Sequence, residues 1–340
     1  MMPEEWPLAA PAADRPVESA RTRGSRRLAS VRRDFFLDPA HRLTEQERAL
    51  MTAMLHDLVG TVLGEVLAAL PAYTDQAPDP ADLASRLSGA GLLDREALVS
   101  MLLRRADEHR IASAYAGRAG PRKLPMLPMF VGDKDASVAA AAMALVVARG
   151  RRRDTFGQPR IELADLPFEE AALLACSVAA ALAPDNNGSH LAMADAARTV
   201  AAAHSPSDSL DAAVAGLVDA LDSAGRNDDA LAEATAEDGE ASLLAGLLAG
   251  RAGISIDTAW GYLMGGQDDG LALLSRMAGL RRPTAARLIA EFGALAGVSI
   301  EDEIAHFDSL DEGEVQSALA WWRLPPDFRA ARSALKVAHG

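Results

Sequence analysis

The stretch Ala252-Gly253-Ile254-Ser255-Ile256-Asp257 recurs 44 residues later as Ala296-Gly297-Val298-Ser299-Ile300-Glu301. Apolar positions keep this offset beyond the two stretches, since Leu271 corresponds to Val315. Each copy is predicted to contain a capped helix, a short break and a second apolar helix. A period of about 40–47 residues built from helix pairs is typical of HEAT-like or armadillo-like stacks. This internal 44-residue repeat therefore predicts two helix pairs over about 252–340.

Composition extends the helical prediction to the whole chain. Hydrophobic residues make up 49% of the 340 residues and aromatic residues only 4%, so alanine, leucine and valine carry the apolar share. Alanine and leucine favour helices, whereas strands draw on β-branched and aromatic residues. We therefore expect an all-α fold, a HEAT-like α-solenoid in which antiparallel helix pairs stack on one another.

Three regions are predicted along the chain. Residues 1–24 combine prolines, alanines and arginines, which predicts a disordered, arginine-containing N-terminal arm. Residues 25–204 are expected to form an N-terminal helical region, whose longest helix begins with a capping box at Thr44 and runs to Leu70. Residues 205–340 are expected to form a C-terminal helical region that contains the two repeats.

Charge is unevenly distributed. The net charge of −14 disfavours binding to nucleic acid or to an anionic membrane, because phosphates repel a negative surface. Residues 15–33 nevertheless contain seven arginines against one acid, and residues 205–240 contain ten acids against one arginine. Three interpretations of the arginine-rich arm stay open: it contacts an anionic partner, it docks on the acidic stretch, or it is a soluble tail.

The chain is expected to be soluble and cytoplasmic. Its single cysteine, Cys176, lies in the apolar run 171–183, which predicts a buried, inert thiol in a reducing compartment. The N-terminus has no apolar segment of the kind found in a secretory signal. The runs 138–148 and 171–183 are much shorter than the roughly 20 residues that a membrane helix needs.

Motifs that indicate catalysis or metal binding are missing from the sequence. The seven histidines never show the i, i+4 spacing of a zinc helix, and a lone cysteine cannot build a cysteine-rich site. Gly265-Gly266 lacks the lysine of a phosphate-binding loop. We therefore predict no catalytic, cofactor-binding or metal-binding residues and no cofactor. An enzyme with an unrecognised site remains an alternative.

A second alternative rests on Leu55-His56-Asp57-Leu58, which is similar to the His-acid-Leu core of the phosphorylated helix in sensor kinases. An exposed imidazole beside a carboxylate is what histidine phosphotransfer requires. In sensor kinases this core is followed by Arg/Lys-Thr-Pro, whereas in this chain Val59-Gly60-Thr61 follows. His56 is thus the alternative phospho-acceptor, and an exposed histidine opposite an apolar stripe is the simpler interpretation.

Five residues are candidate contacts for a protein partner. Neighbouring helical side chains point about 100° apart, so we expect one of Trp321 and Trp322 to face inward and the other outward. Aromatic residues are favoured at binding hot spots. Arg151, Arg152 and Arg153 follow directly after a predicted helix and add positive charge.

Three stretches together resemble the alphaproteobacterial proteins grouped as domain of unknown function 2336, a helical, HEAT-like family. They are 33–48, then 91–98 with Glu108-His109-Arg110, and 270–280 with Trp321-Trp322-Arg323-Leu324 and Pro326. The resemblance implies a fold but no catalytic residues. We therefore predict a non-enzymatic helical-repeat protein that acts in bacterial signalling as an interaction or scaffold module for another protein. The identity of that protein and the oligomeric state are not predicted.

Overall fold

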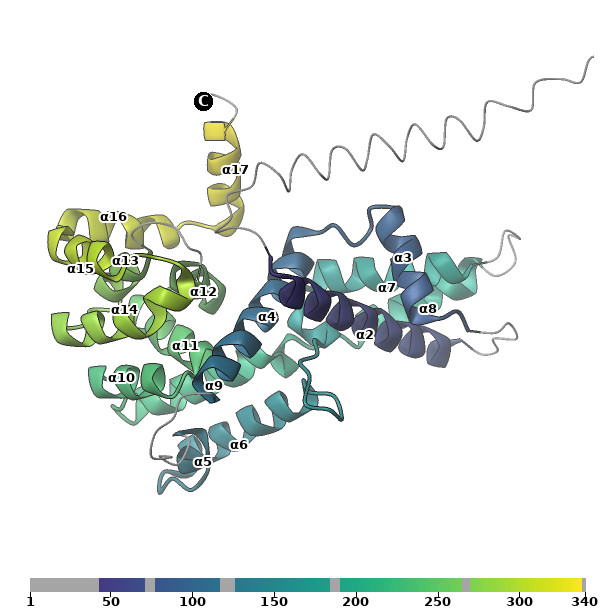
Figure 1. Ribbon diagram of the computed structural model, residues 1–340. Helices are drawn as coiled ribbons and strands as arrows, with labels where there is room; N and C mark the ends of the chain where they lie inside the picture. The colour runs from purple at the N-terminus through teal and green to yellow at the C-terminus, as the bar shows by residue number, and fades with distance from the viewer. Residues whose placement is uncertain (1–42, 71–76, 117–125, 184–189, 265–269, 338–340) are drawn as a thin grey trace, which may run out of the picture. The chain divides into compact units, whose positions relative to one another are not determined.

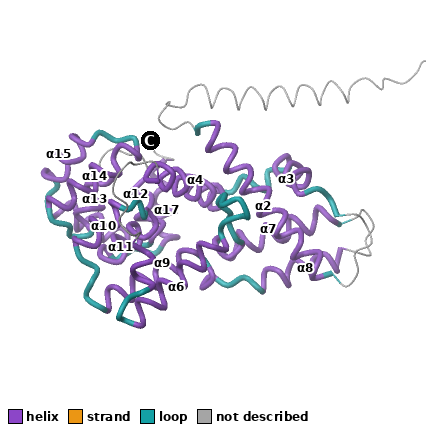
Figure 2. The backbone as a smooth tube through the Cα atoms, turned by 60° about the horizontal axis from the view of Figure 1, so that its bottom comes forward, coloured by secondary structure: helices purple, strands orange, loops and turns teal. Residues whose placement is uncertain are grey.

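The computed structural model describes residues 43–70, 77–116, 126–183, 190–264 and 270–337. Within these ranges the chain forms α-helices, short 3₁₀ turns and loops, with an isolated bridge between Arg153 and Pro159 (Figures 1 and 2). The all-α prediction is confirmed for this part of the chain. Internal contacts divide the chain between Thr44 and Glu45. The predicted arm 1–24 lies outside the described residues.

A first core is formed by five helices, α2 (Glu45–Ala69), α3 (Pro80–Gly89), α4 (Glu96–Ala116), α7 (Phe168–Leu182) and α8 (His190–Ala202). In Figure 1, α2, α7 and α8 lie side by side, and they also pack together in pairs. The side chains that α2 buries are Met54, Leu58, Val59, Val62, Leu63 and Val66. Their three- and four-residue spacing is the apolar stripe of an amphipathic helix, which explains why α2 packs as it does.

Within the described ranges, α2 is the one helix long and apolar enough to cross a membrane by length and composition. It packs against α3, α4, α7 and α8, and its apolar stripe forms part of the first core.

A second core lies between α5 (Met126–Val131), α6 (Ala136–Arg151), α9 (Leu210–Ser223) and α11 (Ala241–Ala252). It joins helices from both sides of residues 204 and 205, where the boundary between the two helical regions was predicted. The second core therefore contains helices from both predicted regions, because α6 buries its apolar face against α9.

A third core contains Ile111 of α4 together with α11 and six further helices. These are α10 (Asp229–Glu237), α12 (Ile256–Met264), α13 (Gly270–Met277), α14 (Arg282–Ala296), α15 (Ile300–Ser309) and α16 (Glu312–Trp322). The last described helix is α17 (Pro326–Val337). Because α4 supplies Leu98 and Leu102 to the first core and Ile111 to the third, it connects the two.

The two copies of the 44-residue repeat form equivalent structural elements. Ser255 and Ser299 cap α12 and α15 as predicted, since each hydroxyl accepts a hydrogen bond from the amide three residues later. Gly253 and Gly297 end α11 and α14 with φ of 67° and 77°, a left-handed conformation that suits glycine. At the same offset α14 corresponds to α17, so each copy spans three helices instead of the predicted pair. The predicted break at 265–266 lies outside the described residues.

Candidate functional site: a buried charge network and an exposed aromatic loop

Three arginines and three carboxylates gather between segments of all three cores. Two of the arginines, Arg104 and Arg105, come from α4 and are buried. Arg104 pairs with Asp211 of α9, where its Nη1 donates to Oδ2 at 2.9 Å and its Nη2 lies 2.8 Å from Oδ1. The guanidinium of Arg104 also lies 5.1 Å from the ring centroid of Trp260, a cation–π contact. These contacts connect α4 to α9 and α12.

Glu108 lies one turn further along α4 and neutralises Arg105. Nη1 of Arg105 donates to both Glu108 oxygens at 2.6 Å. The Ser242 hydroxyl of α11 donates to Glu108 Oε1 at 2.7 Å. A buried ion pair of this kind is tolerated only when hydrogen bonds satisfy the charges, and here α11 supplies one of them.

Arg152 and Asp165 form the most enclosed pair of the network. Nε of Arg152 lies 2.9 and 2.8 Å from the two Asp165 oxygens, and Nη2 lies 2.7 Å from Oδ1. Asp165 ends the 3₁₀ turn η2 (Leu163–Asp165), and its carboxylate also accepts from the Leu210 and Glu162 amides at 3.0 Å. One carboxylate therefore joins the end of α6, the turn η2 and the start of α9.

The arginines keep Asp165 and Glu108 ionised. Burial by itself raises the pKa of Asp165, but the hydrogen bonds from Arg152 and the charge of Arg105 outweigh burial and lower it. Burial likewise raises the pKa of Glu108, and the charges of Arg105 and Arg104 outweigh it, so this pKa is also lowered. Because arginines hold Asp165 and Glu108 ionised, these two carboxylates are suited to fixing helices and not to exchanging protons.

We expect the protein to lose stability in acid, because Asp165 and Glu108 have pKa values below those of an unfolded chain. Their stabilising contribution is complete above the unfolded carboxyl pKa of about 4 and is lost as the pH falls through the lower folded values. Asp107 has the opposite effect on the stability in acid, since burial raises its pKa. Urea unfolding between neutral pH and pH of about 3 measures the effect. An Asp165→Asn variant should lose less stability over this range than the parent does, and an equal loss would contradict the assignment.

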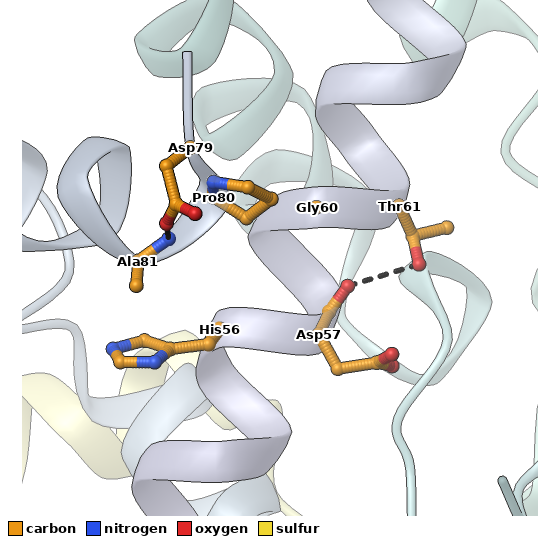
Figure 3. A pocket seen from close by; sticks show the side chains of 7 residues that line it. All are labelled: His56, Asp57, Gly60, Thr61, Asp79, Pro80 and Ala81. Carbon is orange, nitrogen blue, oxygen red and sulfur yellow. Dashed lines mark hydrogen bonds between the residues drawn. The ribbon is translucent and has the colours of Figure 1, made fainter.

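His56 lines an open pocket of about 520 Å³ between α2 and the start of α3 (Figure 3). The imidazole and the Asp57 carboxylate point in different directions, and Asp57 Oδ2 accepts from Nε of Arg160 at 2.7 Å. Asp79 caps α3 by accepting from the Ala81 amide at 2.7 Å. The imidazole–carboxylate pair expected for phosphotransfer is therefore not formed, because Arg160 holds the carboxylate.

The three predicted contact arginines have different surroundings. Arg151 and Arg153 are exposed. Arg152 is only 4% exposed, and its guanidinium binds Asp165 and the Asp208 carbonyl, at 2.9 Å from the latter. This burial removes Arg152 from the predicted partner contacts, because its charge is neutralised inside the protein.

The tryptophan pair ends α16, and both side chains are half-buried. Trp322 faces the third core, where its Nε1 donates to the Tyr262 hydroxyl at 2.8 Å and the two rings meet edge to face. The guanidinium of Arg329 lies 4.4 Å from the Trp322 ring centroid. Trp322 is thus the inward ring of the pair. One ring was predicted to face outward as a partner anchor, but neither tryptophan side chain is fully exposed.

An aromatic side chain that was not predicted as a site, Phe156, is 87% exposed in the loop after α6. Oδ1 of Asp154 accepts from the Phe156 and Gln158 amides, both at 2.8 Å. Gly157 adopts φ of 79°, and the Arg160 amide donates to the Arg152 carbonyl at 2.9 Å. The loop is therefore closed by its own hydrogen bonds. The sequence does contain a signal for this loop. It is an aromatic residue between turn-forming residues, in a chain that is poor in aromatics.

The acidic stretch 205–240 is largely used inside the fold. Asp211, Asp229 and Glu233 each form an ion pair with an arginine of another helix or loop. The predicted docking of the arm 1–24 on this stretch stays a prediction, because the arm lies outside the described residues. These pairs show that much of the negative charge already has a partner.

Two further observations concern side chains that could bind a metal or react. In the part of the chain that the structure describes, no three His, Cys, Asp or Glu residues are grouped so that they could hold a metal ion. Cys176 was predicted to be buried, and this is wrong, since its side chain is exposed on α7. The apolar run 171–183 turns one face to solvent, where Ala180 is also exposed.

Residues 122–320 match the model of a family described as uncharacterised proteins conserved in bacteria. No curated protein and no solved structure matches the chain. The matched segment contains the Phe156 loop, the Arg152–Asp165 pair and both copies of the 44-residue repeat up to α16. His56 and α4 lie outside it.

Proposed function

Because this chain belongs to that family of uncharacterised bacterial proteins, DUF2336, we propose that it is a non-catalytic interaction module that binds another protein through the Phe156 loop. The observation that carries the proposal is the exposure of a phenylalanine on a loop that is already ordered. Aromatic residues that can be buried in a partner's pocket supply much of the binding energy of protein interfaces.

Order in the loop makes the exposed ring an efficient anchor. Binding through a flexible loop costs conformational entropy, which lowers affinity. Here the Asp154 carboxylate holds the Phe156 and Gln158 amides, and Arg152 anchors the base of the loop through Asp165. The ring can therefore be buried by a partner without first ordering the loop that carries it.

The charge near the loop indicates the surface chemistry of the partner. Arg151 and Arg153 are exposed on either side of the buried Arg152, on a chain with a net charge of −14. Positive patches attract negatively charged surfaces and speed their encounter. We propose a partner protein with an apolar pocket for Phe156 and acidic residues around that pocket.

A scaffold role is supported by how the buried charges are used. Arg104 pairs with Asp211 of α9, and Arg152 pairs with Asp165 of η2. Arg105 pairs with Glu108 of its own helix, and the Ser242 hydroxyl of α11 donates to that carboxylate. These contacts connect α4 to α9 and α11, and the end of α6 to η2. We propose that they act as structural contacts that present the loop and not as acid–base groups.

Replacing Phe156 by alanine should abolish partner binding while leaving the fold intact, because the side chain is exposed. The test is affinity capture from the bacterial source with the full chain as bait, quantified by mass spectrometry. Proteins that depend on the loop should be recovered by the parent and lost by Phe156→Ala by about tenfold or more.

Leu191→Ala is the matched control, because Leu191 is 77% exposed and belongs to a different element, α8. It should recover the same proteins as the parent. Equal recovery by Phe156→Ala and the parent would contradict the proposed site, and loss with both variants would indicate nonspecific adhesion through exposed apolar side chains.

The finer architecture is also proposed. The equivalence of α11, α14 and α17 at the 44-residue offset, and the packing of α13 on α15 and α16, support a HEAT-like solenoid in the C-terminal part. The large excess of arginine over lysine supports an alphaproteobacterial origin. We propose that the protein works in the cytoplasm, in bacterial signalling.

A further inference from the structure

Helix α17 is amphipathic, and its apolar side faces solvent. Phe328, Ala331 and Leu335 recur at three- and four-residue spacing, which places them on one face of the helix. We call these three residues the apolar face of α17. All three are exposed, and the exposed fractions of Phe328 and Leu335 are 52% and 54%. A helix of this kind normally buries its apolar side in a core, but α17 packs closely on none of the other described helices.

The apolar face is flanked by positive charge that has no partner. Residues 323–337 contain four basic residues against one acid, in a chain with a net charge of −14. Arg332 is exposed and lies beside the apolar face, about one turn from both Phe328 and Leu335. Among the described residues, neither Arg332 nor the exposed Arg323 forms an ion pair. Uncompensated charge of this kind attracts an acidic surface.

The 44-residue repeat shows which kind of element covers a helix in this place. Helices α11, α14 and α17 are equivalent at the 44-residue offset. Helix α12 follows α11 and packs on it, and α15 follows α14 and packs on it. Each covering helix begins at a capping serine, Ser255 or Ser299. No helix of the described residues takes the equivalent place on α17. The fold therefore leaves open a position that it fills twice elsewhere with a helix.

Helix α15 shows the chemistry that suits this place. Its first turn carries three acidic residues, and Ile300 packs on Gly293 of α14, where a Cβ would lie 3.3 Å from Cγ1 of Ile300. At the other end of α15, the Asp308 carboxylate accepts from Nε and Nη2 of Arg282 of α14, both at 2.7 Å. An arginine and an apolar surface of α14 are thus covered by a carboxylate and apolar side chains of α15.

We propose that α17 binds an acidic amphipathic helix of a partner protein. The partner's apolar side chains cover the apolar face of α17, and its carboxylates pair with Arg332 and the other basic residues of this segment. Helix α17 and the Phe156 loop are separate elements, so the inference does not rest on the function proposed above. Phe156→Ala should therefore bind such a helix as the parent does.

The test uses a fluorescent peptide with the α15 sequence, residues 298–311, as the probe of an acidic amphipathic helix. Fluorescence anisotropy measures its binding to the full chain. The parent should bind the peptide weakly and saturably, because one helix pair is a small interface. Phe328→Ala and Arg332→Glu should each lower the affinity by about tenfold. The loss with Arg332→Glu should shrink at high salt, where charges are screened. Circular dichroism reports whether these exposed substitutions leave the helices intact.

Two variants of α8 are the matched controls. Leu191→Ala removes a side chain that is 77% exposed, and Arg198→Glu reverses the charge of a side chain that is also 77% exposed. Both should bind the peptide as the parent does. A peptide with the same residues in scrambled order keeps the charge and loses the apolar side. It should bind at least about tenfold more weakly than the α15 peptide, which separates recognition of a helix from attraction by charge alone.

Other occupants of the apolar face give different results. If Arg282→Glu abolishes peptide binding while Phe328→Ala retains it, the peptide has replaced α15 on α14. If vesicles of phosphatidylglycerol and phosphatidylcholine bind the parent in place of the peptide, and do not bind Phe328→Ala, the face contacts an anionic lipid surface. If sedimentation velocity shows a dimer that Phe328→Ala abolishes, the face binds a second copy. Each of these results would overturn the proposal, as would a parent that does not bind the peptide or binds it no more tightly than Phe328→Ala does.

Discussion

Replacing Asp165 by asparagine is expected to lower the free energy of unfolding by about 3–5 kcal/mol. The change removes the nearest countercharge of the buried Arg152 guanidinium and leaves it Glu162, whose Oε2 lies 3.2 Å from Nη2. It also weakens the carboxylate contacts to the Leu210 and Glu162 amides. Removing one member of a buried ion pair leaves an uncompensated charge in a medium that solvates it poorly. Urea unfolding at neutral pH, followed by circular dichroism, measures the loss.

The matched control is Asp195→Asn, which makes the same chemical change in an exposed pair. Asp195 and Arg198 are both largely exposed on α8. Exposed pairs contribute about 0–1 kcal/mol, so this variant should unfold almost as the parent does. If the two variants lose similar stability, the buried network does not hold the helices as described.

Replacing Gly239 by alanine is expected to cost about 2–5 kcal/mol, because two penalties add. Gly239 lies between α10 and α11 with φ of 70°, a conformation that residues with a Cβ adopt at a cost. A Cβ at this position would also lie 2.4 Å from Cγ of Tyr115, whose ring packs against Phe292 of the third core. Thermal and urea unfolding measure the loss.

Two controls separate the penalties. Gly225→Ala has nearly the same φ, 67°, but its Cβ meets no atom within 4 Å, so it should show the backbone cost alone. Gly239→Ala in a Tyr115→Ala background should cost less than in the parent, because the ring contact is gone. Equal losses for Gly239→Ala and Gly225→Ala would show that Tyr115 yields freely and that packing contributes little.

Local features of the fold follow directly from the residues that carry them. Ser255 and Ser299 cap their helices, and Gly239 separates α10 from α11 in a left-handed conformation. The helix predicted over 44–70 is observed as α2. Caps, glycine breaks and apolar periodicity act between residues a few positions apart, so a sequence contains all the information they need.

The partners of the charged side chains could not be predicted in this way. Arg104 pairs with Asp211, more than one hundred residues away, and nothing in the local pattern around Arg152 distinguishes it from the exposed Arg151. The Phe156 loop could have been identified as a turn, but not as a closed turn that holds an exposed ring. Such pairings depend on which helices meet, and that depends on the packing of the whole chain.

Helices α6 and α11 separate the two kinds of information most clearly. Composition and spacing identify both as helices rich in alanine and leucine or valine, and both are apolar for several turns. In the fold, α11 is buried on all sides because α9, α10, α12 and α13 pack around it, whereas α6 is covered on one side alone. An apolar sequence specifies that a helix can be buried, because burial of its side chains is favourable. Which sides are covered is settled by the neighbouring helices, because each helix can bury only the faces that its neighbours reach.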